Sequence, residues 1–261
     1  MHSWTSPEIT PPVTTQMAQI RQALLEQITA GLLQPGTRLP SERELSERFA
    51  TTRITLKEAL AALEAEGKIY REERRGWFVA STRFIYDPRY KSHFQAMVEA
   101  QNRQVTTQVQ SAGLIVAPVG LCQQLQLPPL STLLQINRLR QLDGRNVLYV
   151  EHFLLPARFP GLLACDLEQS LTRLYAERYG IRYGRSCFEI VPGAARGAVA
   201  RGLNLADGAP VLLITRINYD EQGQLIDCDR EYWRHDAVAI QIESQSWCDG
   251  PADPPRQEST R

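Results

Sequence analysis

Residues 16–80 constrain the fold most, because they carry three amphipathic helical patterns in close succession, followed by a short hairpin. In the first pattern, Ile20 and Leu24 recur at the spacing of one helical face. Ser41 and Glu44 have the spacing of a capping box and predict the start of a second helix. Only a few residues separate the second and third patterns, which is the arrangement of a helix-turn-helix.

Thr52 predicts the N-cap of the third helix, and a leucine stripe that starts at Leu56 predicts its buried face. Two short strands, Ile69–Glu72 and Trp77–Ala80, follow this helix with a charged turn between them. Three helices followed by a hairpin predict a winged helix-turn-helix, in which the hairpin is the wing.

The polar side chains that this core does not use have the chemistry of a DNA interface. Arg53, Thr55 and Lys57 fall in the first turns of the third helix, where a recognition helix contacts bases and phosphates. Basic and acidic residues are nearly balanced in this segment, so solvated surface charge is the alternative interpretation. The residues predicted from their positions to contact DNA are Arg43, Arg53, Thr55, Lys57, Arg75 and Gly76.

Composition and motifs exclude several classes of protein. The chain has 29 basic and 29 acidic residues, so an electrostatic partner must be met by a local patch. No glycine-rich phosphate loop, nucleophile elbow or dinucleotide fingerprint occurs, and the five cysteines are scattered, so we expect no enzyme, cofactor or metal site. No apolar run could cross a bilayer and the N-terminus does not resemble a signal peptide, so we expect a cytoplasmic protein without membrane contact.

The rest of the chain predicts a second domain of the α+β class. Val- and Leu-rich runs joined by short turns predict two hairpins, and two helical patterns lie between the hairpins. We therefore expect an antiparallel sheet with helices on one face. The predicted boundaries are a disordered N-terminus at 1–15, the winged helix-turn-helix at 16–80, a linker at 81–94, the second domain at 95–245 and a disordered tail at 246–261.

Charged residues on the predicted strands suggest a small-molecule pocket. Arg138 and Arg140 lie two apart on one strand and therefore point to the same face, where they need solvent or an anion between them. Glu151, on the returning strand, either accepts a hydrogen bond from a ligand or pairs with Arg140 across the strands. Asp227 and Tyr232 come from the second hairpin. An acid–base pair for hydrolysis is disfavoured, because no nucleophile or metal ligand accompanies the carboxylates.

Most of residues 16–80 resembles the N-terminal domain of the GntR family of bacterial transcriptional regulators. The resemblance rests on the strings Pro35–Leu45, Thr52–Leu60 and Leu63–Gly67. It implies that Arg43, Thr52, Arg53, Thr55 and Lys57 contact DNA, with Gly76 in the wing. Lys57 replaces the usual arginine, which favours a phosphate contact over a bidentate guanine contact. Ile54 replaces a residue that is often polar or valine, which leaves the base preference at its position open.

Residues 95–243 resemble, more diffusely, the UTRA ligand-binding domain of the HutC subfamily, which is similar in fold to chorismate lyase. The matching motifs include Arg138-Leu139-Arg140, Ser170-Leu171 and the closing stretch 227–236. The resemblance implies a pocket in which an anion and the rest of the ligand are bound by different side chains. Those implied to hold the anion are Arg138, Arg140 and Ser170, and those implied to read the rest are Glu151, Asp227 and Tyr232.

Together, these patterns predict a ligand-responsive transcriptional regulator, most simply a repressor. It would bind an inverted-repeat operator in double-stranded DNA as a homodimer, because one head covers too few base pairs for useful specificity. The two arginines favour a small anionic effector, such as a phosphorylated or phosphonate compound. The alternatives are a chorismate-lyase-like enzyme with a DNA-binding head and an architectural DNA-binding protein without a ligand.

Overall fold

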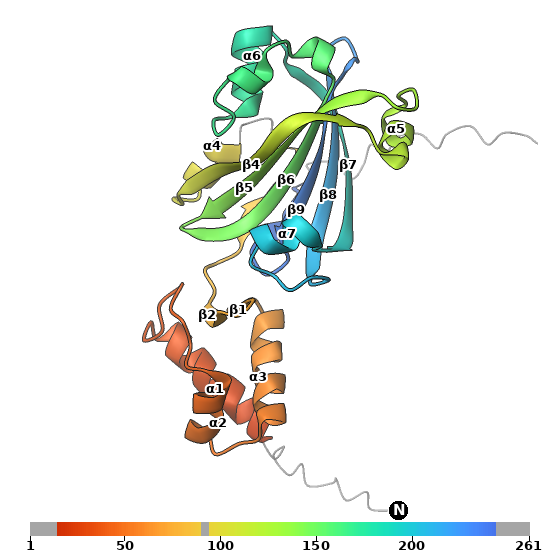
Figure 1. Ribbon diagram of the computed structural model, residues 1–261. Helices are drawn as coiled ribbons and strands as arrows, with labels where there is room; N and C mark the ends of the chain where they lie inside the picture. Colours follow the sequence, from red (N-terminus) through yellow and green to blue (C-terminus); the bar gives the residue numbers. More distant parts are fainter. Residues whose placement is uncertain (1–14, 90–93, 244–261) are drawn as a thin grey trace, which may run out of the picture.

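The computed structural model describes residues 15–89 and 94–243, which form an N-terminal head and a larger α+β domain stacked end to end (Figure 1). The predicted disordered segments fall, apart from Thr15, outside the described residues. Three helices and a two-stranded hairpin make up the head: α1 (Gln16–Thr29), α2 (Glu42–Arg48), α3 (Arg53–Ala65), β1 (Ile69–Glu72) and β2 (Gly76–Val79).

The helices of the head begin at capping residues. The Ser41 hydroxyl accepts from the backbone N–H of Glu44, whose carboxylate accepts from the backbone N–H of Ser41, so α2 opens on a complete capping box. The Thr52 hydroxyl accepts from the N–H of Thr55 at 3.2 Å and caps α3. Leu56, buried with the other α3 leucines, packs against α1 and the hairpin in one apolar core.

The second domain is built on a six-stranded antiparallel sheet with strand order β4-β5-β6-β9-β8-β7. Its strands are β4 (Val105–Val116), β5 (Thr132–Leu142), β6 (Arg145–Leu154), β7 (Tyr183–Ala194), β8 (Pro210–Asp220) and β9 (Leu225–Arg234). A separate parallel pair joins β3 (Phe84–Tyr86) to β10 (Val238–Ile240). Part of the segment expected as linker, 81–94, is therefore a strand that packs with this domain.

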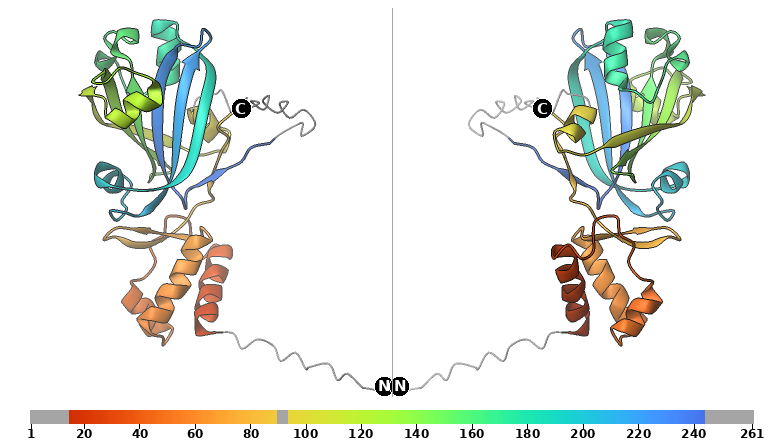
Figure 2. Two further views of the ribbon diagram at one scale, coloured as in Figure 1. Left: turned by 90° about the vertical axis from the view of Figure 1, so that its right-hand side faces the viewer. Right: turned by 90° about the vertical axis from the view of Figure 1, so that its left-hand side faces the viewer.

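Helices cover both faces of this sheet, which corrects the expectation of helices on one face. They are α4 (Phe94–Glu99), α5 (Val119–Leu125), α6 (Leu171–Tyr179) and α7 (Gly197–Gly202), with short 3-10 turns η1 (Pro156–Arg158) and η2 (Leu162–Ala164). The apolar clusters place α4, α6, η2 and the β3–β10 pair on one face, and α5 and α7 on the other. Figure 2 shows the same division from two sides.

A bulge in each central hairpin decides which side chains face the site. In the β5–β6 hairpin, Gln141 is opposite Asn146 but Arg140 is opposite Leu148, so Val147 is an extra residue on β6. The β8–β9 hairpin also shifts register just after its turn. Because side chains alternate along a strand, one extra residue moves every later side chain to the other face relative to its partner strand.

Candidate nucleic-acid interface and ligand cavity

The first turn of α3 presents exposed polar side chains on the surface of the head. Arg53 and Lys57 are exposed and Thr55 is half-buried, while the leucines of α3 fill the core. Thr52 accepts from the N–H of Thr55 alone, and the other backbone N–H groups of this first turn favour an anion such as phosphate. Arg43 on α2 is also exposed, with its Nε 3.9 Å from the carboxylate of Glu47. Arg43, Arg53 and Lys57 are therefore all accessible on the head.

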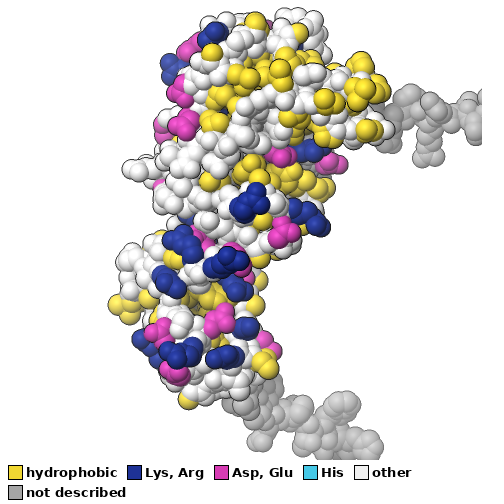
Figure 3. Space-filling model, viewed as in Figure 1, with side chains coloured by type: hydrophobic (Ala, Val, Ile, Leu, Met, Phe, Trp, Pro, Cys, Tyr) yellow, Lys and Arg dark blue, Asp and Glu magenta, His cyan; other side chains and the backbone are white. Residues whose placement is uncertain are grey.

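The wing carries the other predicted contacts, and its tip is less free than the sequence suggests. Gly76 has φ = 95°, a backbone conformation that favours glycine in a tight turn. Arg75 donates to the carboxylate of Glu72 at 2.5 Å and lies over the ring of Phe78. On the face drawn in Figure 3, Lys and Arg side chains gather over the head and the adjoining edge of the second domain, with acidic side chains between them.

A cavity of about 380 Å³ lies on the face of the sheet that α4 and α6 cover. Of the predicted ligand residues, Arg138, Arg140, Ser170 and Asp227 line it. Arg138 and Arg140 come from β5, Asp227 comes from β9, and Ser170 caps the N-terminus of α6 by accepting from the N–H of Arg173. The structure thus brings four of the six predicted residues together.

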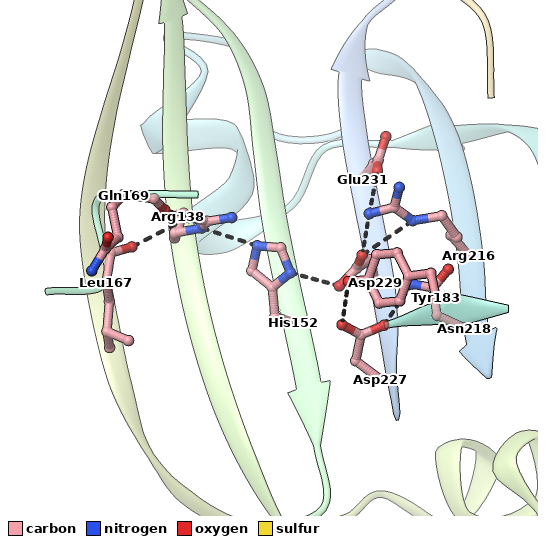
Figure 4. A network of polar contacts seen from close by, with 10 residues as sticks. All are labelled: Arg138, His152, Leu167, Gln169, Tyr183, Arg216, Asn218, Asp227, Asp229 and Glu231. Atoms are coloured by element: carbon pink, nitrogen blue, oxygen red, sulfur yellow. Dashed lines mark hydrogen bonds and ion pairs between the residues drawn. The ribbon is translucent and has the colours of Figure 1, made fainter. Parts of the chain in front are cut away.

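A continuous polar network crosses the floor of the cavity (Figure 4). Arg138 is 2% exposed, and its Nε–H donates to His152 Nε2 at 3.0 Å. Its Nη1 donates to the backbone carbonyls of Leu167 and Gln169. His152 Nδ1 lies 2.5 Å from Asp229 Oδ1. Because Nε2 accepts from Arg138, the proton of a neutral His152 must be on Nδ1, where it is donated to Asp229.

Burial and neighbouring charge fix the protonation of this network. Burial lowers the pKa of His152 to about 4, so the ring is neutral at pH 7. Burial would raise the pKa of Asp229, but His152 and Arg216 outweigh it and hold that pKa well below its usual range. Burial and the charge of Asp229 both raise the pKa of Asp227, which accepts hydrogen bonds from Asn218 and Tyr183. Asp229 therefore carries the negative charge of the pair.

Two polar groups at the cavity have no hydrogen-bond partner among the described residues. The Nε of Arg140 is buried and unpaired, and the guanidinium lies 4.2 Å from the ring centroid of Phe94, with no carboxylate partner within 15–89 and 94–243. The hydroxyl of Tyr175, a residue that is 1% exposed, is also unpaired. By contrast, Arg216 pairs with Asp229 at 2.5 Å and with Glu231 at 3.7 Å. The arrangement leaves Arg140 free to bind an anion, which would fill an unmet hydrogen-bonding need.

The structure corrects the predicted placement of Glu151 and Tyr232. Both lie on the opposite face of the sheet from the cavity, where the Tyr232 hydroxyl donates to Glu151 at 3.0 Å. In a regular hairpin, Glu151 would share a face with Arg138 and Arg140, but the extra Val147 turns it away. Tyr232 is five residues from Asp227, and an odd separation along a strand places two side chains on opposite faces.

Several cavity residues were missed from the sequence. They are His152, Tyr175, Tyr183, Arg216 and Glu231, together with Tyr86 and Phe94 from the segment at the start of the second domain. Glu231 has the same parity as Asp227 and Asp229, so alternation along β9 could have identified it. Nothing local identifies Arg216 or Tyr86, because their strands meet the others only through long-range packing.

The described residues contain neither a candidate metal site nor a candidate membrane-spanning helix. Within 15–89 and 94–243, no group of three or more His, Cys, Asp or Glu side chains could hold a metal ion. In the same residues, every helix is too short or too polar to cross a membrane.

Two family profiles match this chain. Residues 16–79 match the family profile described as bacterial regulatory proteins, gntR family, and residues 100–239 match the UTRA domain. An HTH-type transcriptional regulator, YihL, of Escherichia coli (strain K12) is 33% identical over 81% of this chain and 90% of that protein. The HTH-type transcriptional repressor NagR of Bacillus subtilis (strain 168) is 32% identical over 84% of this chain and 90% of that protein. Both relatives are named as regulators and not as enzymes.

The fold is also similar to that of a solved structure. The crystal structure of PhnF from Mycobacterium smegmatis superposes with a TM-score of 0.60 at 24% identity, covering 87% of this chain and 100% of that one. An N-terminal helix-turn-helix and a C-terminal antiparallel sheet domain are therefore a shared architecture.

Proposed function

This chain belongs to the GntR family of bacterial regulatory proteins and carries a UTRA effector domain, and from this premise we propose that it is a repressor released by a small anion. It binds an inverted-repeat operator as a homodimer through its two heads. A small anionic effector, such as a phosphorylated or phosphonate compound, enters the cavity and lowers the affinity for DNA. We place the chain in the HutC subfamily, in which a GntR head precedes a UTRA domain.

The exposed first turn of α3 supports the DNA-binding role. Arg53 and Lys57 are free of ion pairs among the described residues, so their charges are available to phosphates and base edges. Ile54 is apolar yet 73% exposed in the same turn, which suits contact with a thymine methyl group in the major groove. Arg43 and Thr55 extend this surface, with Thr52 at the helix cap and Arg75 and Gly76 in the wing.

The main support for an anionic effector is that the Nε of Arg140 has no partner among the described residues. Arg140 lies beside the buried Arg138, and burial together with this neighbour lowers its pKa, so a bound anion would relieve an unfavourable charge. Ser170 at the N-terminus of α6 and the free hydroxyl of Tyr175 add neutral donors near the same cavity. Asp227 lines the cavity too, where its raised pKa suits hydrogen bonding to uncharged parts of the ligand.

The free edge of the sheet supports the homodimer. Among the strands of the described residues, β4 pairs only with β5, so its other side is unpaired there. Leu114 and Val116 at its end are 61% and 62% exposed, and the nearby Val119 at the start of α5 is 73% exposed. Figure 3 shows hydrophobic side chains over α5 and the adjoining end of the sheet. An apolar patch next to an unpaired strand suits a two-fold contact with a second copy.

The effector proposal is tested by thermal unfolding with inorganic phosphate or methylphosphonate. An anion that binds the folded protein raises its melting temperature, so we expect a rise for the wild type and none for Arg140→Ala. Arg173→Ala is the matched control, because Arg173 is an exposed arginine on α6 paired with Glu177 outside the cavity lining. Equal rises in all three proteins would show that the anions bind elsewhere, and no rise in any would count against these two probes as the effector class.

A further inference from the structure

The wing does not project freely into solvent. It lies between the helices of the head and the edge of the effector domain near α7 (Figures 1 and 2). At its tip, the backbone N–H of Glu73 donates to the carbonyl of Asn204 at 2.9 Å. On β1, the carbonyl of Arg71 accepts from Arg234 Nη2, also at 2.9 Å. The backbone of the wing is thus hydrogen-bonded to two segments of the effector domain.

Tyr70 is the side chain at the centre of this contact. The residue is 5% exposed, and its ring stacks on Phe78 within the wing. The guanidinium carbon of Arg145 lies 3.4 Å from its ring centroid, and that of Arg234 lies 5.3 Å away. Both cations come from the effector domain, and cations held against an aromatic ring away from water bind it more strongly than exposed ones.

Asp236 holds the two cations in place from within the effector domain. Its carboxylate accepts from Arg145 at 2.6 Å and from Arg234 at 3.1 Å, and it is fully buried. Arg234 also donates to the carbonyl of Leu203, so its position does not depend on the wing. The receiving surface is therefore pre-organised, and docking costs little ordering of its side chains.

We propose that this contact is a wing latch that keeps the wing off DNA. The wing latch comprises Tyr70, Arg71 and Glu73 of the wing with Arg145, Asn204, Arg234 and Asp236 of the effector domain. The inference rests on the proposed DNA-binding function. A wing whose tip backbone is hydrogen-bonded to Asn204 cannot present the same atoms to a groove, so the latched state binds DNA more weakly than the released one.

The wing latch shares its strands with the effector cavity. β6 begins at Arg145 and carries His152, and β9 carries Glu231 and ends at Arg234. Trp233 lies between Glu231 and Arg234 along β9. Its indole N–H donates to Glu231 at 3.0 Å, and its ring packs against Phe84 of β3, close to where the chain leaves the head. A ligand that draws on the cavity side chains of β6 and β9 therefore acts on the strands that hold the latch.

Hydrogen exchange at the Glu73 amide measures the wing latch directly. Arg145→Met removes one cation yet leaves Asp236 paired with Arg234, and we expect exchange at Glu73 to rise about tenfold. Tyr70→Leu removes the ring from the other side of the contact, keeps apolar packing on Phe78, and should have the same effect. The matched control is Arg158→Met, which removes a part-buried arginine paired with Asp220 at 2.6 Å, far from the wing.

DNA affinity tests whether release of the wing matters. The full-length proteins are titrated into a labelled duplex of mixed sequence at low salt, and Arg145→Met and Tyr70→Leu should bind about threefold or more tightly than the wild type and Arg158→Met. Unchanged exchange at Glu73 in both variants overturns the wing latch. Faster exchange with unchanged or weaker affinity overturns its inhibitory role. If no protein binds the duplex, the DNA-binding proposal fails, whereas the exchange result still decides whether the contact holds the wing.

Discussion

His152 is the residue on which the charge balance of the cavity depends. It lies between the guanidinium of Arg138 and the carboxylate of Asp229, and it can serve both only as the neutral ring with its proton on Nδ1. A protonated ring would lose the hydrogen bond from Arg138 and place two cations together in a buried site. The anion-binding geometry of Arg138 is therefore tied to the neutral state of its neighbour.

This arrangement predicts that protonation of His152 destabilises the fold in acid. Because the folded-state pKa of His152 is about 4 and that of an unfolded histidine is about 6.5, the unfolded chain takes up the proton first as the pH falls. The free energy of unfolding should therefore fall by about 2 kcal/mol more between pH 7 and pH 5 in the wild type than in His152→Gln. Urea unfolding at the two pH values measures it. His235→Gln, at an exposed histidine, should behave as the wild type, and equal slopes in all three proteins would show that His152 is not the group responsible.

A single arginine on α3 should separate DNA binding from folding. Arg53 is exposed and makes no ion pair among the described residues, so Arg53→Ala removes no packing. We expect the loss of a base or phosphate contact to weaken operator binding by about tenfold or more, with an unchanged melting temperature and an unchanged response to anions. Gel-shift titration measures the affinity. Arg185→Ala, at an exposed arginine on β7, is the control, and equal affinities of both variants would remove Arg53 from the interface.

At the scale of elements, the sequence predicts helix starts better than strand faces. Ser41 with Glu44, and Thr52 with Thr55, are local pairs whose hydrogen bonds form within one turn, so their spacing alone predicts the caps that the structure contains. β4 and β7 were not predicted, because edge strands tolerate residues such as Gly113 and Pro192 that usually interrupt a strand.

Which side chains of the central strands face the cavity depends on bulges that cannot be recognised in the sequence. The pair Arg138 and Arg140 was correctly expected on one face, because their relation lies within one strand. Glu151 was placed on the wrong face. Its face relative to that pair is set by the turn at Asp143 and by the extra residue Val147. Relations within a strand were predictable, whereas relations across the hairpin were not.

Gly184, near the start of β7, provides a test of packing in the sheet. A Cβ added at Gly184 would lie 2.6 Å from the backbone carbonyl oxygen of Asp220, and backbone atoms cannot move away cheaply. We expect Gly184→Ala to lower the free energy of unfolding by about 2 kcal/mol. Gly113→Ala in the other edge strand is the control, because nothing lies within 4 Å of its added Cβ. Urea unfolding of the two variants should separate them clearly, and equal stabilities would mean that the β7–β8 pairing shifts to accommodate the methyl group.

At the scale of the whole molecule, two separately packed domains meet at a polar junction. The core of the head is built from α1, α2, α3, the wing and Leu39, and the apolar clusters of the effector domain include none of these residues. Hydrogen bonds and cation–π contacts, which can break without exposing either core, cross the junction. Such a junction allows the domains to change their relative arrangement at small cost, as a ligand-controlled DNA-binding protein requires.

If the effector and DNA act through this one junction, their binding must be reciprocal. An anion that raises the Kd for the operator by some factor must have its own Kd raised by the same factor when the operator is bound. We expect a factor of about 10 to 100, measured by anisotropy titration of labelled operator with and without the anion, and by calorimetric titration of the anion with and without operator. In Arg140→Ala both factors should fall to one while operator affinity without the anion is kept, because the variant removes the proposed anion contact and leaves the head untouched. Unequal factors in the wild type would mean that the anion changes a third equilibrium, such as dimerisation, and would contradict direct coupling between cavity and head.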